Sequence, residues 1–85
     1  MSLVRDAFFA RLKSKLYAKL RAHPVIKDIG SSSDLYVLSE RLVELNRKRI
    51  NSYLESQNFS VKEFERAIEA VMEHILNPAI EELRI

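Results

Sequence analysis

The chain has 85 residues, 47% of them hydrophobic and 31% charged, and a formal net charge of +2 at pH 7. This apolar content excludes a disordered chain and is enough for a single helical domain over residues 1–85. The absence of cysteine excludes disulfides, thiolate chemistry and cysteine zinc sites. No apolar run is long enough to predict a transmembrane segment, and we expect a cytoplasmic protein.

A first helix is predicted over residues 3–22. Its large apolar residues recur at helical spacing and define one buried face: Phe8, Phe9, Leu12, Leu16 and Leu20. Pro24 ends this helix, because the residue before a proline is disfavoured in the α conformation.

Gly30 is the only glycine. A chain this poor in glycine cannot form many hairpin turns, so an all-α fold is predicted. We expect a single turn over residues 24–29, with Gly30 as its left-handed cap. Ser31 and Asp34 then match the spacing of a capping box at the start of the next helix.

The second predicted helix covers residues 34–57 and has a wide apolar arc. One stripe contains Leu35, Leu38, Leu42 and Leu45, and its neighbour contains Tyr36, Val43, Ile50 and Leu54. An arc this wide contacts more than one neighbour, so this helix is predicted to be the central element. It also suggests a partner surface, whose predicted interface residues are Phe8, Phe9, Tyr36, Val43, Ile50 and Leu54.

Two residue pairs predict that a third helix begins at residue 61. Ser60 and Glu63 match a capping box, and Phe59 and Phe64 occupy the positions of a hydrophobic staple.

The ends of the later helices are also marked. Asn58 tolerates the left-handed conformation that ends a helix. Pro78 ends or kinks the third helix and begins a short last one, with Ile80 and Leu83 facing inward. These elements predict a compact three-helix antiparallel bundle with a short fourth C-terminal helix.

Charge is distributed unevenly. Residues 1–30 carry seven basic and two acidic side chains, a net +5, whereas residues 31–85 carry seven basic and ten acidic ones, a net −3. Candidate contacts to nucleic acid or another anion are Arg11, Lys13, Lys15, Arg21, Arg47 and Lys48. The basic residues of the first helix fan around its circumference, so an ordinary solvated face remains an alternative.

Arg49 continues a leucine line of the second helix, which suggests a buried ion pair with Glu65. Exposure to solvent or contact across a dimer remain alternatives for Arg49. Glu65, Glu69 and Glu73 are spaced four apart, and we expect this acidic row to face the basic first helix within the bundle or across a dimer.

Neither histidine, His23 nor His74, has a second ligand at metal spacing, and both are interpreted as capping or surface residues. The sequence therefore predicts no catalytic residue, no metal and no cofactor. The leading hypothesis is a small non-enzymatic protein–protein interaction module that forms a homo-oligomer, as a dimer, or binds another protein. The alternative is a nucleic-acid-binding accessory protein that uses the basic N-terminal helix.

Overall fold

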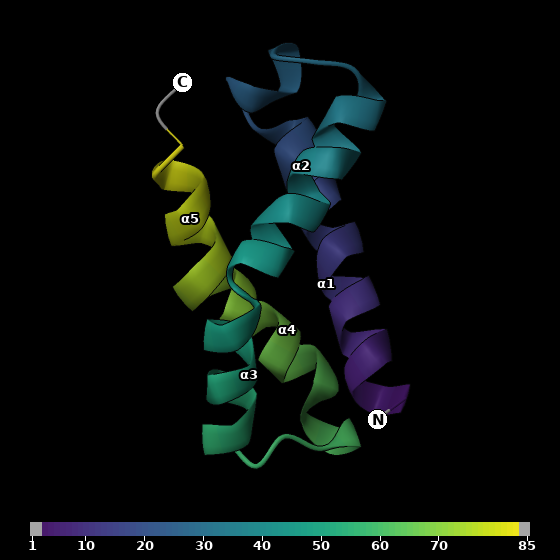
Figure 1. The fold of residues 1–85 in the computed structure, drawn as a ribbon, viewed down its shortest axis with the longest axis vertical. Helices are drawn as coiled ribbons and strands as arrows, with labels where there is room; N and C mark the ends of the chain where they lie inside the picture. The colour runs from purple at the N-terminus through teal and green to yellow at the C-terminus, as the bar shows by residue number, and fades with distance from the viewer. Residues whose placement is uncertain (1–2, 84–85) are drawn as a thin grey trace.

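A computed structural model describes residues 3–83, and the regular structure of this part of the chain is entirely helical (Figure 1). The all-α prediction is therefore confirmed. The chain makes three passes along the long axis: α1 (Leu3–Ala22), then α2 (Ser32–Leu45) and α3 (Arg47–Ser56) in the return direction, then α4 (Phe64–Val71) and α5 (Asn77–Glu81). The described molecule measures 38 × 21 × 19 Å.

The central element is α1, which corrects the prediction that the second helix has this role. All five apolar residues of its predicted face are buried. This stripe packs against α2 on one flank and against α4 on the other. Near its start, the Phe8 ring makes edge-to-face contacts with Phe59 and Phe64, at centroid distances of 5.0 and 5.5 Å.

The connection from α1 to α2 contains the predicted single turn, a 3-10 turn η1 (Ile26–Asp28). Gly30 does not have a positive φ, so its predicted left-handed conformation is wrong. A Cβ at Gly30 would lie 2.8 Å from Asp34 Oδ2, so glycine is needed here for close approach. The capping box is confirmed, because Asp34 N donates to Ser31 Oγ and Ser31 N donates to Asp34 Oδ2.

The single helix predicted over residues 34–57 is wrong, because the chain breaks at Asn46 between α2 and α3. Asn46 Nδ2 donates to the carbonyl of Leu42 at 2.8 Å, and the Asn46 backbone lies at φ −104° and ψ 9°. A side-chain amide that bonds this carbonyl competes with the helical backbone ladder. Beyond the break, α3 buries Ile50 and Leu54 fully, as α2 buries Val43 on the same predicted stripe.

Two of the three local features predicted for the chain reversal between α3 and α4 are present in the structure. Asn58 has φ 51°, as predicted for a left-handed helix end, and the staple rings of Phe59 and Phe64 lie 6.2 Å apart. The capping box predicted for Ser60 and Glu63 is wrong, because the Ser60 side chain makes no cap bond. Instead a 3-10 turn η2 (Val61–Glu63) forms, in which Glu63 N donates to the Ser60 carbonyl.

The third pass continues through a π-turn, η3 (Met72–Leu76), into α5. Pro78 has no N–H to bond the carbonyl of His74, and the wider turn accommodates this gap. Asn77 N bonds back to the carbonyl of Met72, five residues earlier. The short last helix is confirmed, with Ile80 buried and Leu83 packed against the core.

Candidate functional site

The structure places most of the predicted interface residues inside the fold. Five of the six are buried within the chain itself: Phe8, Phe9, Val43, Ile50 and Leu54. Only Tyr36 lies at the surface, with 48% of its area exposed. The chain's own core takes up the wide apolar arc, because α1 packs against α2 and α4 packs against α3. The interface predicted for these five residues is therefore wrong.

A different set of α2 residues remains exposed. We define the outer stripe as Val37, Arg41 and Leu45, which lie four residues apart along one side of α2. Val37 is 54% exposed and Leu45 is 74% exposed, whereas the opposite face of α2 is buried. The i, i+4, i+8 spacing was visible in the sequence. It was missed because Leu45 was assigned to the core together with Leu42.

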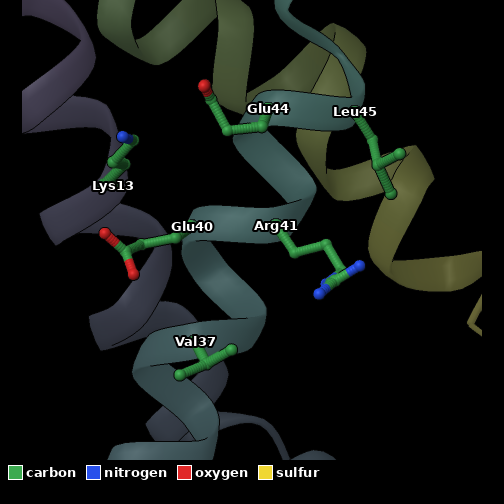
Figure 2. Close-up of a pocket in the computed structure, with 6 residues that line it drawn as sticks. All are labelled: Lys13, Val37, Glu40, Arg41, Glu44 and Leu45. Carbon is green, nitrogen blue, oxygen red and sulfur yellow. The ribbon is translucent and has the colours of Figure 1, made fainter.

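The outer stripe borders an open surface hollow of about 510 Å³ (Figure 2). The other residues that line this hollow are Lys13, Glu40 and Glu44. In Figure 2 the Glu40 side chain extends toward α1, whereas Arg41 extends away from α1. Within residues 3–83, Arg41 makes no hydrogen bond or ion pair.

Glu44 gives one edge of the outer stripe a fixed negative charge. Its Oε2 atom lies 2.7 Å from Nη2 of Arg47. The hydrogen bond from Arg47 lowers the pKa of Glu44, the charges of Arg47 and Lys13 lower it further, and partial desolvation opposes the shift. Arg47 is held in turn over the ring of Phe9, 4.1 Å from its centroid. Glu44 is therefore ionised at neutral pH.

An aromatic contact lies on the α1 side of the same surface. The rings of Tyr17 and Tyr36 meet edge to face at 5.9 Å, and the Arg21 guanidinium lies 5.7 Å from the Tyr17 centroid. A second hollow, of about 610 Å³, runs between α1 and α2 past these tyrosines and shares Lys13 and Glu40 with the first. The surface that borders the outer stripe is thus aromatic and charged.

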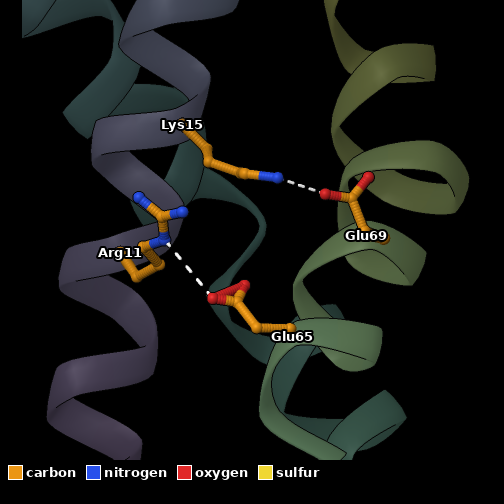
Figure 3. Close-up of polar contacts among 4 residues, drawn as sticks. All are labelled: Arg11, Lys15, Glu65 and Glu69. Atoms are coloured by element: carbon orange, nitrogen blue, oxygen red, sulfur yellow. Dashed lines mark hydrogen bonds and ion pairs between the residues drawn. The ribbon is translucent and has the colours of Figure 1, made fainter.

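Two of the three residues of the predicted acidic row, Glu65 and Glu69, face α1 (Figure 3). Arg11 Nε lies 3.8 Å from Glu65 Oε1, and Lys15 Nζ pairs with Glu69 Oε1. The hydrogen bond and charge of Lys15 lower the pKa of Glu69, whose side chain is 66% exposed. These two pairs join α1 to α4 within one chain.

The six candidate nucleic-acid contacts do not gather on one surface. Arg11 and Lys15 face α4, while Lys13 and Arg47 lie beside α2. Arg21 packs on Tyr17, and Lys48 is exposed on α3. Acidic or aromatic neighbours contact four of these six cations, and nucleic-acid binding stays a prediction.

The predicted buried ion pair between Arg49 and Glu65 is wrong. Arg49 is exposed, and Glu65, with 66% of its side chain exposed, pairs with Arg11 instead. The leucine line leaves the core before the break between α2 and α3, because Leu45 on that line is 74% exposed, and Arg49 lies one turn further along it. Ile50 takes the inward position.

His23 acts as a capping residue, as predicted. Its Nδ1 atom accepts hydrogen bonds from the backbone N–H groups of Val25 and Ile26, at 3.1 and 3.2 Å. His74 is exposed. Across residues 3–83, no three histidine or acidic side chains are grouped so that they could hold a metal ion. Likewise, no helix of this described part has the length and apolar character needed to cross a membrane.

Comparison with known proteins identifies no relative: no family model, no curated protein and no solved structure matches this chain. Its role must be inferred from its own surface, in which the outer stripe and the ionised Glu44 are the most distinctive features.

Proposed function

We propose that this protein is a small non-enzymatic interaction module that associates with a second copy of itself through the outer stripe of α2. One observation carries the proposal. Val37 and Leu45 are large aliphatic residues, more than half exposed, on a helix whose other face is buried. These two residues and the stem of Arg41 between them give α2 a small exposed apolar strip with charged margins, on which a weak protein contact can form.

The size of the surface sets the strength of the association. Complete burial of an aliphatic side chain contributes about 1.5–3 kcal/mol, and association must also overcome the loss of translational and rotational freedom. The outer stripe offers only two exposed aliphatic side chains, Val37 and Leu45, whereas a standard interface buries about 20–30 residues a side. The proposed dimer is therefore weak, with a dissociation constant on the order of micromolar or above.

Charge favours a second copy as the partner. Arg41 is an exposed cation without an ion-pair partner among residues 3–83, and Glu44 is an ionised carboxylate one turn further along α2. Glu44 already pairs with Arg47, but a carboxylate has about four acceptor sites, so Arg41 of a second copy can share it. The stem of Arg41 can at the same time cover the apolar area between Val37 and Leu45.

Sedimentation equilibrium of the full chain, from about 10 μM to about 0.5 mM, tests the proposal over the range expected for a weak interface. Wild type should move from monomer toward dimer as concentration rises. Leu45→Lys should remain monomeric with an unchanged melting temperature, because Leu45 contributes little to the core.

Val61→Lys is the matched control, because Val61 is also an exposed aliphatic residue, 68% exposed, but lies outside α2. It should dimerise like wild type. A wild-type chain that stays monomeric over the whole range would overturn the proposal, and so would a dimer that Val61→Lys disrupts and Leu45→Lys does not.

A further inference from the structure

We infer that the two copies pack with their α2 helices antiparallel, about a two-fold axis that passes beside Arg41. This inference rests on the proposed self-association and adds its direction and register. It follows from the order of side chains along the outer stripe, in which Arg41 lies midway between Val37 and Leu45.

A two-fold axis at Arg41 places each residue opposite the one equally far on the other side of that position. Val37 then lies against the partner's Leu45, and the symmetry repeats this contact. A smaller side chain thus meets a larger one at both ends, which fills the interface evenly. A parallel pair would instead set Leu45 on Leu45 and Val37 on Val37, and would align the two helix dipoles.

The Glu44 carboxylates explain how the two positively charged Arg41 side chains can lie close together at the two-fold axis. Two guanidinium groups close together need carboxylates, because an unpaired charge loses hydration on burial. In this register the partner's Glu44 lies one turn from the position that faces Arg41, within reach of its long side chain. Arg47 lowers the pKa of Glu44, so the carboxylate is charged where Arg41 needs it.

The charge pairing is tested by a swap. Arg41→Glu alone should weaken dimerisation about tenfold or more, since it places carboxylates against each other, and Glu44→Arg alone should do the same with cations. An equimolar mixture of the two variants should regain the dimer, because each charge then faces its opposite. Failure of the mixture to recover, with both variants folded, would overturn the pairing.

Cysteine cross-linking tests the register, and the chain has no native cysteine to interfere. Val37→Cys mixed with Leu45→Cys should form a disulfide-linked heterodimer rapidly under mild oxidation, and Arg41→Cys should cross-link with itself. Val37→Cys alone should cross-link slowly, because eight residues of helix separate the two thiols by about 12 Å, beyond disulfide reach. Ala18→Cys, exposed on α1, measures random collision.

The outcomes separate this inference from the function on which it rests. If Val37→Cys alone forms disulfides faster than its mixture with Leu45→Cys, the two helices are parallel. That result would overturn the register and leave self-association in place. If the chain sediments as a dimer but all the α2 cysteine variants cross-link only as fast as Ala18→Cys, the contact between the copies lies elsewhere. That result would overturn both the register and the α2 surface. A monomeric wild-type chain would overturn the proposed function itself.

Discussion

Helices α1 and α2 are both amphipathic, yet they use their apolar residues differently. The α1 stripe is entirely buried, with α2 on one flank and α4 on the other. The inner face of α2 is equally buried, but Val37 and Leu45 remain exposed on its outer stripe. The position of a helix in the bundle, as well as its pattern, therefore decides which apolar residues form the core.

The strongest test of this contrast compares one truncation on each helix. Phe8→Ala should destabilise the fold by about 3–5 kcal/mol, because Phe8 is fully buried among other aromatic rings. Leu45→Ala should change the stability of the monomer by less than about 0.5 kcal/mol. Urea denaturation at a dilute, monomeric concentration measures both. Equal losses would contradict the assignment of Leu45 to the surface.

A smaller effect is expected at the reversal that brings α4 against α1. Asn58 has a positive φ, so Asn58→Ala should cost about 1–2 kcal/mol through backbone strain. Asn58→Gly removes the strain and should restore or exceed wild-type stability. Thermal unfolding of the pair distinguishes backbone conformation from loss of the side chain. If alanine and glycine behave alike, strain is not the cause.

The start of α2 offers a double-mutant cycle. Asp34→Ala should cost about 1 kcal/mol through loss of the capping box. Gly30→Ala should also destabilise wild type by roughly 0.5–1 kcal/mol, because the new Cβ displaces the Asp34 carboxylate from its cap. In the Asp34→Ala background the same glycine change should cost less, because the carboxylate is gone, although the Cβ of residue 34 still lies 2.9 Å from the new methyl group. Additive losses in urea denaturation would show that Gly30 acts independently of Asp34.

The smallest effect is expected from the ion pairs between α1 and α4. Lys15 lowers the pKa of Glu69 in the folded chain. The ion pair therefore contributes to folding stability at pH values above the ordinary pKa of a carboxyl group, and this contribution is lost as pH falls through the lowered pKa. Glu69→Gln should therefore be slightly less stable than wild type at neutral pH, with the difference vanishing in acid. Melting temperatures of both chains across this range provide the measurement. A difference that grows as pH falls would have the wrong sign.

Signals carried by neighbouring residues could be predicted from the sequence. The limits of α1, the capping box of Ser31 and Asp34, and the left-handed Asn58 each depend on a few adjacent groups. The staple of Phe59 and Phe64 belongs to the same class. Such features do not require knowledge of the rest of the fold, but matching spacing is not sufficient, since Ser60 and Glu63 match a capping box that does not form.

Two kinds of feature could not be predicted in this way. The break at Asn46 is local, because its side-chain amide bonds the carbonyl of Leu42, but the apolar pattern continues across it and hides it. The other kind depends on packing: the structure buries Ile50 and leaves Arg49 exposed according to where the neighbouring helices lie. The candidate surface was misplaced because the width of an apolar arc does not reveal how much of it the chain itself covers.

The most direct test of the α2 surface is an NMR dilution series of the full chain, recorded from about 0.5 mM down to about 10 μM, a range suited to a weak interface. Concentration-dependent amide shifts should cluster at Val37, Arg41 and Leu45, and the α4 residues that face α1 should remain unchanged. Shifts confined to other exposed apolar residues, such as Leu3 and Val61, or no shifts at any residue, would contradict the account.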